Sequence, residues 1–178
     1  MKTLILHVAQ VDADISSSNR NSLTRAFPSS SCETAGGIFP VPKEAYNPVR
    51  RQYHSSIILS EISEHALKSE ADRLLGITGV DLYVPRLNFV FGEAQYLGKA
   101  ALISLHRLRP EFYGQPPDKG LFKDRAVKEA IHELGHTLGL EHCQDPLCVM
   151  FFSLHIGMTD RKQPRFCEAC GRKTEQTT

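Results

Sequence analysis

The sequence predicts one α/β domain over residues 1–178, with a small metal-binding appendage near its C-terminal end. A chain of 178 residues with 41% hydrophobic content is long enough for a single domain with a sizeable core. Apolar runs of strand-like composition alternate with segments in which apolar residues recur at helical spacing. Four of the five cysteines lie after residue 142, where they are close enough in sequence to bind a metal ion.

The N-terminal segment MKTLILHVAQVD predicts the first strand. Its apolar run is broken at His7 and has no small-residue cleavage site, so it does not fit a secretory signal peptide. No stretch approaches the roughly 18 apolar residues of a membrane-spanning helix. An odd number of cysteines suits metal ligation in a reducing compartment better than a disulfide framework. We therefore expect a soluble, cytoplasmic protein in which Cys32 is an unpaired loop thiol rather than a regulatory switch.

The charge balance argues against two classes of partner. Lys and Arg number 21 while Asp and Glu number 20, so the net charge is +1. A chain without an excess of positive charge has no net charge that would attract nucleic acid or an anionic membrane surface. We expect neither partner, and we expect a monomer.

Residues 14–45 are rich in Ser, Pro and Gly and show little periodicity. We expect mostly loop there, with one short strand near Ile38. The next segment, SSIILSEISEHALKSEADRLLG, predicts an amphipathic helix packed on a sheet and beginning behind Ser55. Five apolar residues of this segment recur at roughly helical spacing: Ile57, Ile58, Ile62, Ala66 and Leu67.

Residues 79–105 are apolar, rich in Val, Phe, Tyr and Leu, and interrupted by Pro and Gly, which predicts two or three strands. The segment KDRAVKEAIHELGHTLG predicts a helix that Asp124 caps and Gly139 ends. Six apolar residues share one face of this helix: Ala126, Val127, Ala130, Ile131, Leu134 and Leu138. Lys128 and Glu129 are expected to face solvent. The polar tail GRKTEQTT is expected to be disordered.

His132 and His136 lie on this predicted helix, four residues apart. Because four residues make about one turn, their imidazoles project from the same face and can bind one metal ion. Zinc with three neutral protein ligands keeps a positive charge and an open position, which lowers the pKa of a bound water to about 7. The carboxylate of Glu133, beside the ligands, can accept the proton of that water and return it to a leaving amine.

A third histidine completes the ligand set. Gly139 can adopt a positive φ without a Cβ clash, so the chain can leave the helix sharply and bring His142 back to the ion. The whole string, HExxHxxGxxH, is the metzincin signature, and Met150 downstream fits the Met-turn that belongs with it. The alternatives are a structural helix with histidines satisfied by other partners, and a Met150 that is only a core residue.

The four C-terminal cysteines predict a second metal site. Cys143, Cys148, Cys167 and Cys170 are separated by four, eighteen and two residues. Paired short spacings joined by a longer loop are the usual arrangement of a tetrahedral zinc bound by four thiolates. The alternative is two disulfides or a redox-active CEAC motif. That motif does not open the helix of a βαβ unit, as a thioredoxin-like motif would, which favours the zinc site.

With HELGHTLGLEHC, CxxxxC, CxM and the distal CxxC, residues 132–170 resemble the archaemetzincin family. The looser matches YNPVRRQY and LYVPRLNFVFGEA extend the resemblance over much of the chain. The resemblance implies a compact metzincin-like α/β domain with a mixed twisted sheet, an active-site helix and a C-terminal segment bound to zinc. It also implies zinc-dependent peptidase chemistry on a peptide or protein substrate, and two zinc ions per chain.

The resemblance further assigns roles to individual residues. The residues that would bind the catalytic zinc are His132, His136 and His142. Glu133 would be the general base. The residues that would bind the structural zinc are Cys143, Cys148, Cys167 and Cys170.

Two other functions stay open: a two-zinc binding module without catalysis, and a zinc hydrolase of non-peptide amides or esters. Glu133 favours catalysis, because a purely structural site has no use for an unliganded carboxylate beside the metal. The segment NFVFGEAQYLG is either a sheet-edge strand to which a peptide adds by main-chain hydrogen bonds, or a core strand. Four residues either rim the cleft or lie on a solvated loop: Tyr46, Arg50, Arg51 and Tyr53.

Overall fold

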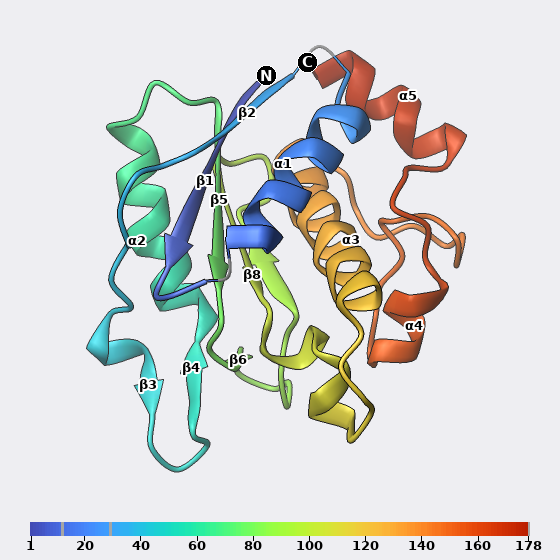
Figure 1. The fold of residues 1–178 in the computed structure, drawn as a ribbon. Helices are drawn as coiled ribbons and strands as arrows, with labels where there is room; N and C mark the ends of the chain where they lie inside the picture. The colour runs from blue at the N-terminus through green and yellow to red at the C-terminus, as the bar shows by residue number, and fades with distance from the viewer. Residues whose placement is uncertain (12, 29, 178) are drawn as a thin grey trace.

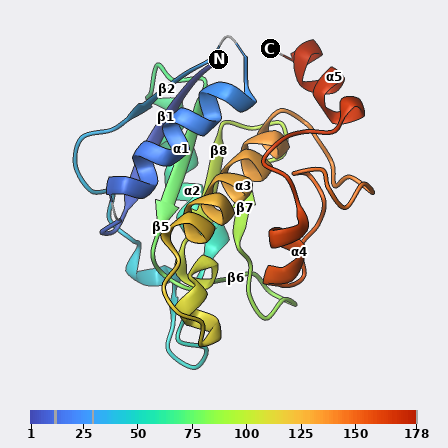
Figure 2. The same cartoon turned by 45° about the vertical axis from the view of Figure 1, so that its right-hand side comes forward.

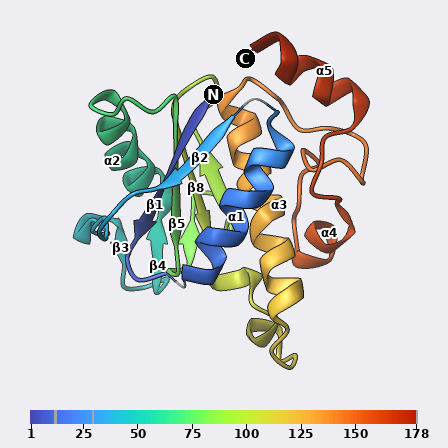
Figure 3. The ribbon, with the colours of Figure 1, turned by 45° about the horizontal axis from the view of Figure 1, so that its top comes forward.

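The computed structural model describes residues 1–11, 13–28 and 30–177. A five-stranded sheet lies at its centre, with α2 on one face and both α1 and α3 on the other (Figure 1). These helices are α1 (Ala13–Ala26), α2 (Ser55–Leu67) and α3 (Lys119–Thr137). Figure 3 shows the same three layers from another side. Each face of the sheet buries its own core, with Ile62 of α2 in one and Leu134 of α3 in the other.

The strand order of the main sheet is β2-β1-β5-β8-β7. Its strands are β1 (Lys2–Val8), β2 (Ser31–Thr34), β5 (Arg73–Thr78), β7 (Gly92–Ala94) and β8 (Ala100–Ser104). Four of them run parallel, whereas β7 runs antiparallel to β8 with Gly92 opposite Ile103. Every residue of β8 is buried, as expected of a strand that is covered on both faces. The sheet is mixed, as the resemblance implied, and β7 forms one edge.

A second, smaller sheet has the order β3-β4-β6. Its strands are β3 (Tyr46–Asn47), β4 (Gln52–His54) and β6 (Leu82–Tyr83). The described part of the chain also contains three 3₁₀ helices: η1 (Lys43–Ala45), η2 (His106–Leu108) and η3 (Pro110–Tyr113). The predicted first strand is confirmed as β1, and the strands predicted within residues 79–105 are confirmed as β6, β7 and β8. No helix in the described part of the chain is long and apolar enough to cross a membrane.

The prediction of mostly loop over residues 14–45 is wrong for the first part of this segment, which forms α1. Ile15, Asn19, Leu23 and Phe27 follow one another at intervals of four residues, and all are buried. Asn19 Nδ2 donates a hydrogen bond of 3.1 Å to the Ile15 carbonyl oxygen, so a polar residue occupies the middle of the buried stripe. Because Asn19 is polar, it interrupts the helical spacing of apolar residues on which the prediction of a helix depends.

Two other predicted elements have different boundaries. The strand expected near Ile38 is a single bridge between Phe39 and Val8, and β2 forms earlier in the chain. The helix expected over SSIILSEISEHALKSEADRLLG ends at Leu67, and the last residues of that segment begin β5. Leu74 is fully buried there, because β5 is a central strand that needs apolar residues on both faces.

Helix α3 begins earlier than expected. Its N-cap is Asp118, whose side chain accepts a main-chain hydrogen bond of 2.9 Å, rather than Asp124. The prediction that Lys128 and Glu129 face solvent is also wrong, since they are 4% and 3% exposed. The cause is a distant segment: α4 (Ile156–Arg161) packs on this side of α3 and covers both residues.

The C-terminal segment runs along α3 and ends in α5 (Glu168–Thr177), as Figure 2 shows. The tail GRKTEQTT was expected to be disordered, and this is wrong as far as Thr177, because these residues belong to α5. An ion pair between Glu168 and Arg172 spans one turn of the helix. Cys170 is buried and anchors the helix to the rest of the domain.

Candidate functional site

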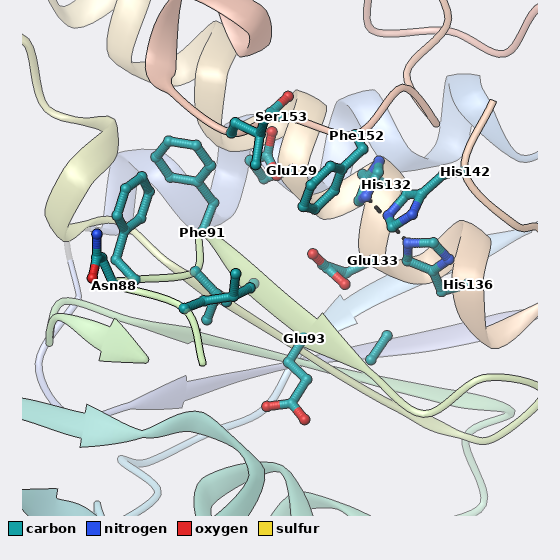
Figure 4. Close-up of a pocket in the computed structure, with 16 residues that line it drawn as sticks. Asn88, Phe91, Glu93, Glu129, His132, Glu133, His136, His142, Phe152 and Ser153 are labelled. Carbon is teal, nitrogen blue, oxygen red and sulfur yellow. Dashed lines mark hydrogen bonds between the residues drawn. The ribbon is translucent and has the colours of Figure 1, made fainter. Parts of the chain in front are cut away.

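Helix α3 and the chain that follows it bring the three predicted histidines together. His132, Glu133 and His136 project from one side of the helix, and His142 returns from beyond the helix end. One ring nitrogen of each histidine lies within 4.8 Å of the others. The Nε2 atoms of His132 and His136 are 3.1 Å apart. Figure 4 shows the three rings meeting at one end of a pocket, with the Glu133 carboxylate beside them.

Main-chain oxygens hold the other ring nitrogen of two of these histidines. His132 Nδ1 donates to the Val149 oxygen at 2.8 Å, and His136 Nδ1 donates to the Leu140 oxygen at 2.7 Å. Because a carbonyl oxygen only accepts, each Nδ1 carries the proton and each Nε2 of the neutral ring presents a lone pair. Burial lowers the pKa of both imidazoles, which favours the neutral form.

This donor set fits a zinc ion. Two nitrogens bound tetrahedrally at about 2.0–2.1 Å are expected roughly 3.3 Å apart, close to the observed 3.1 Å between the Nε2 atoms of His132 and His136. Two lone pairs at that distance repel each other unless a cation lies between them. Main-chain acceptors for the second ring nitrogen are also the usual outer shell of histidine ligands.

The turn that delivers His142 is held by the hairpin between β7 and β8. Gly139 ends α3 with a φ of +84°, as predicted. Leu97 N donates to the His136 oxygen at 3.2 Å, and the Tyr96 hydroxyl donates to the Gly139 oxygen at 3.0 Å. Partial burial lowers the pKa of His142 as well, which favours the neutral ring that can bind a cation.

Met150 is fully buried and packs against Gly135, which lies between the first two histidines on α3. A Cβ atom at Gly135 would lie 2.5 Å from the Met150 sulfur, so the sulfur reaches the helix only because this position has no side chain. The Met150 oxygen accepts a hydrogen bond of 2.9 Å from Cys143 N. Met150 is therefore a core residue, and its place against the histidine-bearing helix is the one a Met-turn requires.

Glu133 is 5% exposed and lines the same pocket as the histidines. Burial raises the pKa of its carboxyl well above the ordinary value, the negative charge of Glu129 raises it further, and the positive charge of Lys162 opposes the rise. A buried carboxylate of this kind is a stronger base than one in water.

One turn before Glu133, Glu129 forms a buried ion pair that the sequence analysis missed. Lys162 Nζ lies 2.9 Å from Glu129 Oε1, and Thr159 Oγ1 donates to the same oxygen at 3.1 Å. Lys162 is 2% exposed and lies 33 residues further along the chain. No local spacing can signal such a distant partner. The one indication in the sequence that Glu129 lies near the site is its position four residues before Glu133, which places both residues on the same helical face.

The four predicted cysteines form a second group, in which the sulfur atoms lie within 4.8 Å of one another. All five cysteines of the chain are free thiols, so the alternative of two disulfides is not formed. The sulfurs of Cys143 and Cys167 are 3.8 Å apart, which matches the roughly 3.8 Å between thiolates bound tetrahedrally at about 2.3 Å. The Cys148 sulfur accepts a hydrogen bond of 3.3 Å from Cys167 N, which stabilises a thiolate. This group fits a closed zinc site.

A pocket of about 340 Å³ opens in front of the histidines. One wall is β7 with the loop before it, and the other is α3 with the segment after Met150. Its apolar lining includes Leu87, Phe89, Val90, Phe91, Phe152 and Leu154. Because β7 is an edge strand, its outer side can take an added peptide strand, which favours the sheet-edge interpretation of NFVFGEAQYLG.

Cys32 belongs to neither group of ligands. It lies on β2 rather than in a loop, and it is half-buried. Burial raises the pKa of its thiol to about 11, although the positive charge of Arg20 opposes this. A thiol with so high a pKa is a poor nucleophile at pH 7, which argues against a regulatory switch.

Comparison with known proteins decides the family. Residues 38–176 match the model of Peptidase family M54. The chain belongs to this family. Among its relatives, the archaemetzincin of Methanocaldococcus jannaschii is 53% identical over 135 residues, which cover 76% of this chain and 73% of the relative. The archaemetzincin of Pyrococcus abyssi is 42% identical over 176 residues, which cover 97% of this chain and 94% of the relative.

Solved structures of archaemetzincins share the fold. The archaemetzincin of Methanopyrus kandleri has a TM-score of 0.85 at 36% identity, over 99% of this chain and 94% of that one. The archaemetzincin of Archaeoglobus fulgidus, solved in complex with malonate, has a TM-score of 0.83 at 37% identity, with coverages of 97% and 99%. The predicted archaemetzincin resemblance and mixed α/β fold are confirmed. Membership of M54 makes this chain a zinc metallopeptidase.

Proposed function

We propose that this M54 peptidase cleaves peptide bonds at a zinc ion held by His132, His136 and His142, with Glu133 as general base. The observation that carries the proposal is the pair of Nε2 atoms, 3.1 Å apart, beside a buried carboxylate in one pocket. Zinc bound there would polarise the scissile carbonyl and lower the pKa of the attacking water.

The edge strand β7 would position the substrate. Its outer main-chain groups can donate to and accept from an extended peptide, while the apolar pocket takes one substrate side chain. The Glu133 carboxylate would accept a proton from water as the water attacks the carbonyl carbon. It would then donate this proton to the nitrogen of the leaving amine.

We also propose a second, structural zinc bound by the thiolates of Cys143, Cys148, Cys167 and Cys170. The support is the grouping of four free sulfurs within 4.8 Å of one another, of which the pair Cys143 and Cys167 lies at a tetrahedral separation of 3.8 Å. A closed site of four thiolates leaves no position for water or substrate, so this ion would hold the fold rather than act on the substrate. The chain would then carry two zinc ions.

The test is cleavage of a peptide library by the zinc-loaded protein, run beside Glu133→Gln. The amide is nearly isosteric but cannot accept a proton, so the variant should keep its fold and metal content and lose at least about 100-fold in rate. Full activity in Glu133→Gln would overturn the general-base role. Absence of cleavage by a fully loaded wild-type protein would favour a binding module. Cleavage of simple amides or esters alone would favour a non-peptide hydrolase.

A further inference from the structure

The segment YNPVRRQY forms the turn between β3 and β4, close to the pocket but outside its lining. Asn47 organises the turn, because its Oδ1 accepts from Val49 N and from Arg50 N, each at 3.1 Å. Asn47 Nδ2 also donates to the Tyr83 hydroxyl at 3.2 Å. The turn is therefore fixed to β6 and holds Arg50 in one place.

Arg50 reaches from this turn to the loop between β6 and β7. Its Nη2 donates to the main-chain oxygens of Leu87 and Asn88, each at 2.9 Å, and its Nε donates to Gln52 Oε1 at 2.9 Å. The guanidinium carbon lies 4.3 Å from the centre of the Tyr83 ring. Gln52 Nε2 adds a further hydrogen bond of 2.9 Å to the Asn88 oxygen. A side chain on the turn thus binds the backbone of a different loop at two successive residues.

The loop that Arg50 binds forms part of the pocket wall, which we define as residues 87–90. This loop needs external support, because Arg86, immediately before the wall, has a φ of +76°. A non-glycine residue in that region is strained and persists only where its surroundings hold it. Arg50 supplies such support at the next two residues.

The aromatic face of the pocket wall is held separately. The Arg107 guanidinium lies 4.4 Å from the centre of the Phe89 ring and pairs with Asp81 at 2.7 Å. Phe89 meets Phe91 edge-to-face, with ring centres 5.0 Å apart. Arg107 therefore orients the Phe89 ring, whereas Arg50 places the backbone that carries it.

We propose that Arg50 is a positioning residue that sets the shape of the pocket wall and thereby selects a large apolar side chain in the substrate. The selected side chain is apolar because Leu87, Phe89, Val90 and Phe91 line this part of the pocket. Arg50 would not touch the reacting atoms. The inference rests on the proposed peptidase function, and the experiment below separates the two.

The test compares Arg50→Ala with Arg51→Ala. Arg51 is the neighbouring exposed arginine, so the second substitution removes the same charge without changing a contact with the pocket wall. The substrates are peptides with Ala, Leu or Phe placed in turn on each side of the scissile bond. Arg50→Ala should raise KM about tenfold for the preferred Leu or Phe substrate and leave kcat within about twofold, since a displaced wall weakens side-chain binding. Arg51→Ala should match the wild type, and Arg50→Lys should recover part of the loss. An unchanged preference in Arg50→Ala would overturn the proposal.

Binding of short peptide hydroxamates to the zinc-loaded proteins, measured by calorimetry, repeats the comparison without turnover. A leucine-bearing hydroxamate should bind the wild type more tightly than its alanine counterpart, and Arg50→Ala should reduce this ratio about tenfold. A wild type that shows this selection but cleaves no peptide would contradict the peptidase function alone. Equal ratios in the wild type and Arg50→Ala would contradict the role of Arg50, whatever the rate of cleavage.

Discussion

The Glu133 carboxylate lies in the space that a side chain at Gly92 would fill. A Cβ atom at Gly92 would lie 2.6 Å from Glu133 Oε1 and 2.7 Å from the Leu102 oxygen. The edge strand and the histidine-bearing helix therefore meet at a position where only glycine fits. This contact places the proposed base against the strand along which the substrate would lie.

Gly92→Ala should therefore displace Glu133 and lower the rate about 100-fold, because misplacement of a reacting group by about 1 Å has an effect of this size. Zinc content should remain unchanged, since the three atoms nearest to that Cβ position belong to Glu133 and Leu102 and not to a histidine. Gly36→Ala is the matched control, because a Cβ atom at Gly36 meets nothing within 4 Å. Equal peptidase rates for the two variants would show that Glu133 tolerates a side chain at this position.

Lys162→Met should destabilise the domain strongly. The change leaves the Glu129 carboxylate buried without its partner, which costs about 3–5 kcal/mol in the free energy of unfolding. Arg172→Met is the control, because it breaks an exposed ion pair that contributes about 1 kcal/mol or less. Denaturant unfolding of both variants measures the difference. A double variant, Lys162→Met with Glu129→Gln, should recover part of the loss, and equal effects of the two single variants would contradict the argument.

The purified protein should contain two zinc ions that differ in lability. The histidine site keeps an open position and should lose its ion first to a chelator, whereas the closed thiolate site should release its ion slowly. Elemental analysis before and during chelation measures both values. A content near one ion per chain, with the cysteines oxidised to disulfides, would remove the proposed structural site.

The grouping of the three histidines and that of the four cysteines could be predicted, because each set consists of residues at short spacings, with one longer loop between the two cysteine pairs. His132 and His136 meet through the period of one helix, and Gly139 supplies the turn that brings in His142. Strands β1 and β8 and helix α3 were predictable for the same reason, since apolar period reports local structure, whereas the start of β5 was assigned to the preceding helix and β2 to a loop. Helix α1 was missed because Asn19 interrupts the apolar stripe while remaining buried itself.

The contacts that complete the pocket could not be predicted, because they join residues far apart in the sequence. Arg50 binds the backbone of Leu87, 37 residues away, and Lys162 pairs with Glu129 across a segment that contains the three histidines and two of the four cysteines. Composition and the periodicity of apolar residues describe neighbours along the chain, so they give no information about pairs that are distant in sequence. A charged residue in a predicted helix therefore appears exposed until the tertiary structure covers it.

The cluster of three histidines and the cluster of four cysteines are also joined to each other. His142 and Cys143 are adjacent in the chain, and the oxygen that holds His132 Nδ1 belongs to Val149, the residue after Cys148. Val149 N donates to the Arg165 oxygen at 3.0 Å, two residues before Cys167. Neighbouring Cα atoms are about 3.8 Å apart and ligand bonds are about 2.0–2.3 Å long, so with the reach of the His142 and Cys143 side chains added, ions at the two sites would lie no more than roughly 15 Å apart.

Cys167→Ser should therefore loosen the zinc at the histidines, although residue 167 is distant from them in sequence. Loss of the thiolate site frees the segment that orients His132, and outer-shell changes of this kind alter metal affinity about 10- to 100-fold. The measurement is zinc affinity of the histidine site at a temperature where the variant stays folded, with Cys32→Ser as the control thiol. If the affinity matches that of Cys32→Ser, the two sites are neighbours without energetic coupling, and the hydrogen bond from His132 to Val149 does not transmit the effect.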